Sequence, residues 1–253
     1  MKNKLVCHLI ANYPDFDQSL KIAIALAEGG ADSIEVQFPF SDPSADGPYI
    51  LKACDAAIKS GFTVKKGFEL VQKIIEKTKL NVYIMSYANI LFAMGIENFV
   101  KESKRIGVNG LIIPDLTISN DEGLIESGKK YGIPIIPVVT LTTPLKRIDE
   151  ILSYKPEYLY AVLRKGITGK STKITEENIS FLELFSEKKI KIMGGFGINT
   201  REQVKLLAPH LYASVAGTVF VKIIDKGGKD TLLDLKNIVS TLTNFTKKEF
   251  LCL

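Results

Sequence analysis

The amino-acid sequence predicts an α/β protein folded as a (β/α)8 barrel of the TIM type, with residues 1–253 as a single domain. Its length of 253 residues suits this fold, which typically takes about 250. Eight short β-rich runs also alternate with helical patterns, as the repeated strand–helix unit of the barrel requires. The alternative is an open, doubly wound sheet. The first predicted strand, however, leads into Asn12-Tyr13-Pro14-Asp15 and not into the GxGxxG turn of that fold.

The eight strand candidates are apolar on both faces and rich in Val, Ile or Tyr, which is typical of parallel strands buried on two sides. They are residues 5–11, 33–38, 81–86, 110–113, 134–140, 158–162, 190–193 and 211–215. Between them, apolar residues recur with the 3.6-residue period of a helix, as Leu20, Ala23 and Ile24 do in the first pattern. The helical patterns are residues 19–30, 65–77, 97–107, 121–131, 143–153, 176–187 and 201–208.

The composition, with 46% hydrophobic and 24% charged residues, is that of a globular protein. Apolar runs such as residues 133–139 fall far short of the roughly 18 residues of a membrane helix, and the N-terminus lacks a signal-peptide pattern. Cys7, Cys54 and Cys252 lack disulfide or metal-binding spacing, so we expect reduced thiols, no metal and a cytoplasmic location. The net charge of +5 is spread without aromatic clusters, which excludes a nucleic-acid patch and would suit a small anionic substrate.

The second predicted strand carries a glutamate near its carboxyl end, where barrels place their active sites. Strand alternation puts Ile34 and Val36 on one face and Glu35 and Gln37 on the other. A buried glutamate costs several kcal/mol unless it is paired or neutral. Glu35 is therefore a candidate for proton transfer, and a structural glutamate bonded to a neighbouring lysine or tyrosine is the alternative.

The loop after this strand, residues 40–48, contains two aspartates, Asp42 and Asp46, beside two prolines and a glycine. Aspartate before proline or glycine is a common turn former, and that explains one of the two carboxylates well. For two carboxylates that follow a glutamate at a strand end, an active-site loop and turn formation are equally good explanations.

Glycine-rich turns follow the last two predicted strands. The seventh strand runs into Gly194, Gly195 and Gly197, and the eighth runs into Gly217 and Thr218. Glycine lets the backbone approach a ligand closely and exposes N–H groups. Because the loops after strands seven and eight form the usual phosphate site of such barrels, the sequence predicts phosphate binding here.

Three further features leave alternatives open. Residues 164–172 are small and polar, as in a mobile lid or in a solvated loop. Tyr87 is expected either in the wall of a pocket or in the core. His8 lies inside the first strand and His210 just before the eighth, and no Ser or Cys stands at a sharp turn, so a nucleophile–histidine triad is not expected.

The run IEVQFPFSDPSADGP resembles the signature of the tryptophan synthase α subunit family. The segments SYANILF, PDL, YLYAVLRKGITG, GGFGI and VAGTVFVK are similar to further family segments and occur in the same order, over residues 5–224. The resemblance implies a carbon–carbon lyase of tryptophan biosynthesis that cleaves indole-3-glycerol phosphate by a retro-aldol step, giving indole and glyceraldehyde 3-phosphate.

The resemblance also implies roles for individual residues. Glu35 matches the proton-shuttling glutamate of the family, and Asp46 matches the aspartate that hydrogen-bonds the indole N–H. The substrate-binding residues that it implies are Tyr87, Tyr160, Thr168, Gly169, Phe196, Gly197, Gly217 and Thr218. It implies no cofactor or metal in this chain, and a β subunit that carries pyridoxal phosphate in an α2β2 heterotetramer.

The chain departs from the family pattern in three places. It enters the first strand at Leu5 without the usual preceding helix, Gln37-Phe38 replaces a glycine and a small apolar residue, and Thr117 replaces a proline at the expected β-subunit contact. A poorly catalytic barrel that binds a phosphate ligand and activates a β subunit is therefore the alternative function. An aldolase with a Schiff-base lysine is disfavoured because Lys165 and Lys191 are poorly placed.

Overall fold

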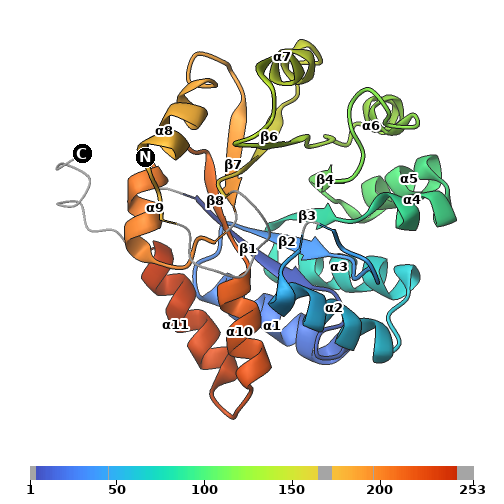
Figure 1. Cartoon of the computed structure of the whole chain (residues 1–253). Coiled ribbons are helices and arrows are strands. Elements are labelled where there is room, and N and C mark those ends of the chain that lie inside the picture. Colours follow the sequence, from blue (N-terminus) through green and yellow to red (C-terminus); the bar gives the residue numbers. More distant parts are fainter. Residues whose placement is uncertain (1–3, 45, 165–172, 196, 244–253) are drawn as a thin grey trace.

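The computed structural model describes residues 4–44, 46–164, 173–195 and 197–243. Its eight strands are all parallel and form one sheet in the order β4-β3-β2-β1-β8-β7-β6-β5 (Figure 1). A parallel bridge between Leu111 and Ile135 joins β4 to the chain just before β5, which nearly closes the sheet on itself. The predicted (β/α)8 barrel is confirmed. The strands are β1 (Lys4–Ile10), β2 (Ser33–Gln37), β3 (Asn81–Met85), β4 (Gly110–Ile112), β5 (Val138–Thr140), β6 (Tyr158–Val162), β7 (Lys191–Gly195) and β8 (Ala213–Ala216).

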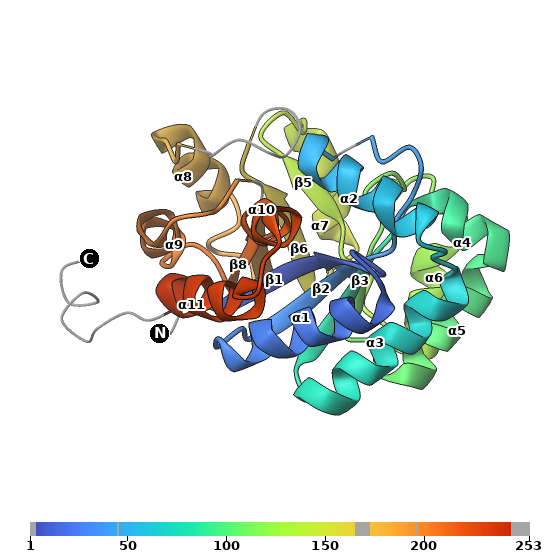
Figure 2. The same cartoon turned by 90° about the horizontal axis from the view of Figure 1, so that it is seen from below.

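Helices surround this sheet (Figures 1 and 2). Within the described ranges they are α1 (Phe16–Glu28), α2 (Pro48–Lys59), α3 (Val64–Thr78), α4 (Ala88–Met94), α5 (Ile96–Ile106), α6 (Leu124–Tyr131), α7 (Leu145–Ser153), α8 (Glu176–Glu183), α9 (Arg201–Leu207), α10 (Thr218–Lys226) and α11 (Thr231–Thr243). None of these helices is long and apolar enough to cross a membrane.

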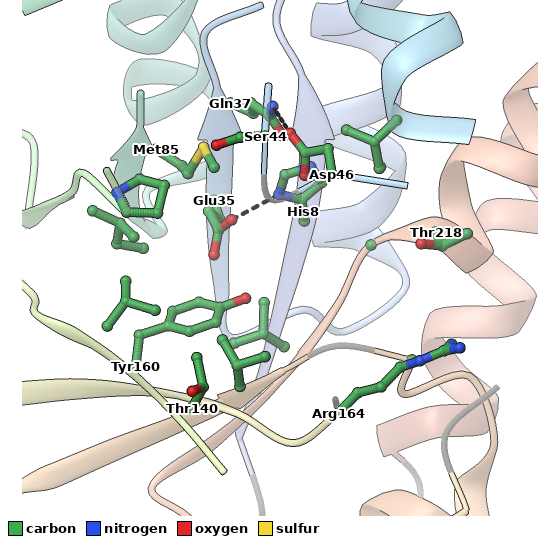
Figure 3. Close-up of a pocket in the computed structure, with 18 of the residues that line it drawn as sticks. His8, Glu35, Gln37, Ser44, Asp46, Met85, Thr140, Tyr160, Arg164 and Thr218 are labelled. Atoms are coloured by element: carbon green, nitrogen blue, oxygen red, sulfur yellow. Dashed lines mark hydrogen bonds and ion pairs between the residues drawn. The ribbon is translucent and has the colours of Figure 1, made fainter. Parts of the chain in front are cut away.

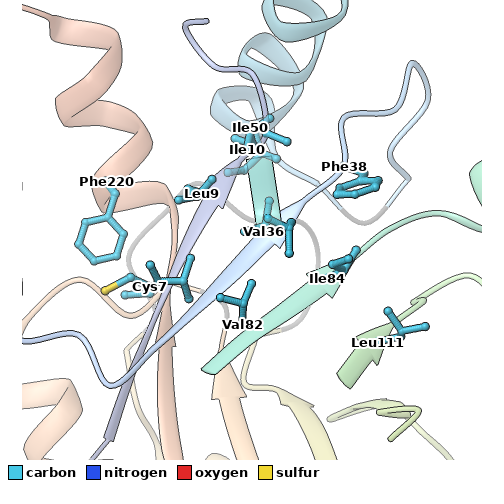
Figure 4. Close-up of a cluster of buried hydrophobic side chains, with 14 of the residues drawn as sticks. Cys7, Leu9, Ile10, Val36, Phe38, Ile50, Val82, Ile84, Leu111 and Phe220 are labelled. Carbon is cyan, nitrogen blue, oxygen red and sulfur yellow. The ribbon is translucent and has the colours of Figure 1, made fainter. Parts of the chain in front are cut away.

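The core has two parts that follow from strand alternation. Outward-facing side chains such as Cys7, Val36 and Ile84 form the larger cluster between the sheet and the helices (Figure 4). The alternate positions, among them Val6 and Met193, form a second cluster inside the barrel. Because alternation is strict, the polar residues that share the inward face of β1 and β2 must lie inside the barrel as well.

The predicted strand 134–140 is wrong in its first half, because β5 begins only at Val138. Pro134 and Pro137 have no N–H to donate to a ladder, which explains the short strand and the isolated bridge at Ile135. Most predicted helices occur with shifted ends. The first begins at Phe16 because Asp15 caps it by accepting from the N–H of Gln18 at 2.8 Å.

Helices α2, α4, α10 and α11 have no counterpart among the predicted helical patterns. Pro48 at the first turn of α2 is a recognisable helix start, but it is also the last residue of the predicted loop 40–48, where proline is typical of a turn. Helix α4 has only seven residues, too few to show a period. Helix α11 packs against α1, where Gly29 leaves room for the backbone of Lys236.

The end of the barrel opposite the strand carboxyl ends is filled by aromatic and lysine side chains. The first described element is β1, and its Lys4 donates to the hydroxyl of Tyr212 at 2.7 Å. Lys191 lies over Tyr158 and Tyr212, with its Nζ 4.9 and 5.4 Å from the ring centroids. Tyr158 in turn packs edge-on against Tyr83 at 5.9 Å. These tyrosines and lysines form the floor of the barrel, where the charged groups of the lysines cover the apolar surface of the rings.

Candidate active site

A cavity of about 420 Å³ opens at the carboxyl ends of the strands. Its walls come from strands β1 to β6 and β8 and from the loops that follow several strands (Figure 3). Six residues of the sequence-predicted site line it: Glu35, Asp46, Tyr160, Gly197, Gly217 and Thr218. Thr168, Gly169 and Phe196 lie outside the described residues.

Glu35 is buried at the cavity wall and is paired with His8. The two residues are register partners on β2 and β1, and Nδ1 of His8 lies 2.7 Å from Oε1 of Glu35. Glu35 is 3% exposed and His8 is 8% exposed. Burial lowers the pKa of His8, but the hydrogen bond and charge of Glu35, together with the charge of Asp46, outweigh it, so that this pKa lies above its ordinary value. The short contact and the raised pKa of His8 favour an imidazolium–carboxylate pair in the cavity wall.

Asp46 is held by two donors, one from β2 and one from the start of α4. Nε2 of Gln37 donates to Oδ2 of Asp46 at 2.7 Å, and the hydroxyl of Tyr87 donates to the same oxygen at 3.1 Å. Burial raises the pKa of Asp46 above its ordinary value, although the hydrogen bonds from Gln37 and Tyr87 and the charge of His8 oppose that rise. Tyr87 thus contacts the carboxylate of Asp46 but is not among the residues that line the cavity.

Tyr160 projects from β6 into the cavity near both carboxylates (Figure 3). Burial raises the pKa of its phenol well above the ordinary value, and the charges of Glu35 and Asp46 add to the shift. The hydroxyl therefore stays protonated. Gly195 makes room for this side chain, because a Cβ there would lie 2.5 Å from the Tyr160 oxygen.

The glycine-rich turns lie on one side of the cavity. Gly197 has a φ of +85°, a conformation that favours glycine. Helix α10 begins at Thr218 after Gly217, so its free N–H groups and the positive end of its dipole are available to an anion. Arg164 also lines the cavity (Figure 3). A side chain on Gly217 would contact the His8 ring at 3.1 Å, and not only the anion site that the sequence analysis assigned to it.

Sequence reasoning did not assign His8 and Gln37 to the site. Alternation alone puts Gln37 on the face of Glu35, and that signal was present. The partner of Glu35 could not be found in this way, because the register of β1 against β2 is a property of the folded sheet. Among the described residues, no three His, Cys, Asp or Glu side chains gather as a metal site.

The model of the tryptophan synthase alpha chain family matches residues 1–249. The chain belongs to this family. A tryptophan synthase alpha chain from Helicobacter hepaticus is 41% identical over 232 residues, which are 89% of this chain and 87% of the relative. The one from Methanocaldococcus jannaschii is 38% identical over 231 residues, which are 89% of this chain and 82% of the relative.

Solved structures agree with this family assignment. Mycobacterium tuberculosis tryptophan synthase superposes with a TM-score of 0.87 at 25% identity, covering 97% of this chain and 94% of the other. A mutant tryptophan synthase alpha-subunit from Pyrococcus furiosus gives a TM-score of 0.85 at 30% identity, covering 94% and 97%. Tryptophan synthase alpha chains cleave indole-3-glycerol phosphate to indole and glyceraldehyde 3-phosphate, so the chain is a lyase of tryptophan biosynthesis.

Proposed function

We propose that Glu35 and Asp46 carry out the retro-aldol cleavage of indole-3-glycerol phosphate in this cavity, with residues 1–253 acting as one domain. The observation that carries the proposal is the presence of two buried carboxylates with different partners in one cavity, beside the N-terminus of α10. Pairs of carboxyl groups in different environments are a recurrent way to divide catalytic roles.

The reaction needs one proton at C3 of the indole and the loss of another from the adjacent glycerol hydroxyl. Protonation at C3 places positive charge on the ring nitrogen, where the carboxylate of Asp46 accepts a hydrogen bond from the N–H. Glu35 in its protonated form gives the proton to C3, and the carboxylate so formed takes the hydroxyl proton as the carbonyl of glyceraldehyde 3-phosphate forms and the C–C bond breaks, which returns Glu35 to its starting state. The electrons of that bond return to the ring and leave neutral indole.

The rest of the cavity supports this division. Backbone N–H groups at Gly197 and Gly217, the hydroxyl of Thr218 and the dipole of α10 suit a phosphate dianion. Tyr160 would contact the substrate from β6, and Tyr87 would orient Asp46 through their hydrogen bond. In this arrangement the phosphate fixes the glycerol chain and the two carboxyl groups act on the indole end.

The test is indole release from indole-3-glycerol phosphate. Glu35→Gln keeps the shape of the side chain and removes its acid–base function, so turnover should fall by about 10²–10⁴-fold. Binding of a glycerol phosphate analogue, measured by calorimetry, should change little. Turnover close to that of the unmodified chain would contradict the role of Glu35.

One observation favours the alternative, a binding barrel that activates its partner. Oε1 of Glu35 is already engaged by His8, which could restrain the carboxylate. In that case the isolated chain would bind the analogue and stimulate a β subunit but release almost no indole, and Glu35→Gln would change neither property. The same pair of assays therefore separates the two functions.

The partner is proposed to be a tryptophan synthase β subunit in an α2β2 heterotetramer, located in the cytoplasm. A solved structure described as a tryptophan synthase complex from Pyrococcus furiosus supports this, with a TM-score of 0.85 at 29% identity. Pyridoxal phosphate would belong to that β subunit. Sedimentation of the mixed subunits would give the stoichiometry.

A further inference from the structure

Two polar residues, His8 and Gln37, stand between the carboxylates of Glu35 and Asp46. His8 contacts Glu35 at 2.7 Å, and Gln37 donates to Asp46 at 2.7 Å. Both come from the inward faces of the adjacent strands β1 and β2. In Figure 3 the His8 ring lies between Glu35 and the Gln37–Asp46 pair.

Three atoms of this group have no hydrogen-bond partner within the described part of the chain: Nε2 of His8, Oε2 of Glu35 and Oε1 of Gln37. The bond from Gln37 to Asp46 uses the amide nitrogen, so the amide oxygen is left as an acceptor. In an imidazolium, Nε2 is a donor. The two unpartnered atoms are therefore complementary.

The charges in the cavity indicate what this arrangement does. The titratable and charged side chains that line it with His8 are Glu35, Asp46, Tyr160 and Arg164. Tyr160 is neutral for the reason given above. Two carboxylates in one buried site repel each other and tend to share a proton. A cation between them removes this repulsion, and His8 is the cation that contacts Glu35 directly.

We propose that His8 is a positioning residue that, as an imidazolium, keeps Glu35 and Asp46 ionised at the same time, with Gln37 linking it to Asp46. This inference rests on the function proposed above, since both carboxylates must be ionised for Glu35 to accept a proton while Asp46 stabilises the indole cation. Loss of the imidazolium would leave one carboxyl protonated and its role unfilled.

The first test needs no substrate, so its result does not depend on the proposed activity. The chain has two histidines, His8 and His210. Labelling with ¹⁵N-histidine therefore gives two imidazoles to follow by NMR, and His210→Gln assigns them. We expect the His8 midpoint to lie above the ordinary histidine value of 6.5, and Glu35→Gln to lower it by about one pH unit or more. A His8 midpoint at or below 6.5, or one that Glu35→Gln does not move, would overturn the proposal.

The second test follows kcat/KM for indole release against pH. In His8→Phe and His8→Gln the acidic limb should move up by about one pH unit or more, because the carboxylates lose their cation. His8→Gln retains a hydrogen-bonding group but no charge, so the acidic limb of its pH profile should move as far as that of His8→Phe. His210→Phe, the matched control, should leave the limb in place. An unmoved limb in both His8 variants, with the fold verified by circular dichroism, would refute the role of His8.

Discussion

Glu35 and Asp46 are both buried, yet each has different partners. Glu35 has an ionisable partner in His8, whereas Asp46 accepts from the neutral groups of Gln37 and Tyr87. A buried carboxylate without a partner costs several kcal/mol. The polar residues of β1 and β2 therefore make the carboxylates compatible with the fold before any substrate binds.

The same pair makes the stability of the fold depend on pH. The pKa of His8 is raised above its ordinary value of 6.5, so its contribution to the free energy of unfolding is complete below pH 6.5 and is lost as pH rises through the folded pKa. Surface carboxylates with lowered pKa, such as Glu102, act in the opposite direction but only below about pH 4.5. Burial raises the pKa of the Cys7 and Cys54 thiols, and this also lowers the free energy of unfolding with rising pH, but only as pH approaches their ordinary value of 9. The window between pH 6.5 and about pH 8 therefore isolates His8.

We predict that the free energy of unfolding falls as pH rises above 6.5, and that His8→Phe removes this decline. Urea denaturation at several pH values measures it. One unit of pKa shift corresponds to about 1.4 kcal/mol. A decline of the same steepness in His8→Phe would show that His8 is not its source.

At the scale of elements, Phe38 explains how the chain accommodates its departure from the family pattern at the end of β2. Its ring is fully buried and packs edge-on against Phe62, Phe68 and Phe99 at 5.3–5.9 Å. Helix α3 approaches this ring through Gly67, where a Cβ would lie 2.7 Å from Phe38 Cζ. The large residue on the strand and the glycine on the helix are therefore complementary.

This complementarity predicts that the effect of Gly67→Ala on the free energy of unfolding changes sign with the residue at position 38. Gly67→Ala should lower the free energy of unfolding by about 1–3 kcal/mol, because the added methyl group overpacks the core against Phe38. In a Phe38→Val background the space is open, and the same substitution should stabilise by up to about 1 kcal/mol through helix propensity.

Urea denaturation of the four variants of this cycle measures the coupling. Lys65→Ala on the exposed face of α3 is the control and should change stability by less than about 0.5 kcal/mol. Equal effects of Gly67→Ala in both backgrounds would mean that the ring and the glycine are not coupled.

At the scale of the whole molecule, the barrel could be predicted because its evidence is periodic and repeated. Eight strands and most helices appear as patterns of apolar residues, and the glycines after the last two strands point to the phosphate end. The boundaries of β5 could not be predicted from apolar content, since Pro134 and Pro137 read as part of an apolar run but cannot donate to a ladder.

The two carboxylates could be predicted to lie together because one segment carries both. Glu35 and Asp46 lie within one loop and strand, so their proximity follows from the chain itself. His8 reaches Glu35 only because β1 pairs with β2 in a particular register. Contacts between segments depend on register and loop geometry, which composition and spacing do not encode.

The two ends of the barrel also differ in their roles. The cavity lies at the carboxyl ends of the strands, whereas Tyr158, Tyr83, Tyr212 and the two lysines fill the other end. In such barrels the carboxyl end carries catalysis and the opposite end serves stability. The ring of Tyr158 connects β6 to Tyr83 on β3 and to Tyr212 before β8, so it ties together strands that are not neighbours in the sheet.

We therefore predict that Tyr158→Ala lowers the free energy of unfolding by about 3–5 kcal/mol, the usual cost of emptying a buried aromatic site. Tyr158→Phe keeps the ring contacts and should cost less than about 1.5 kcal/mol. Thermal and urea denaturation measure both values. At a temperature where each variant is folded, kcat and KM for indole release should match those of the unmodified chain. A fall in kcat of tenfold or more in folded Tyr158→Phe would mean that the floor and the cavity are coupled, because the ring itself is still present in that variant.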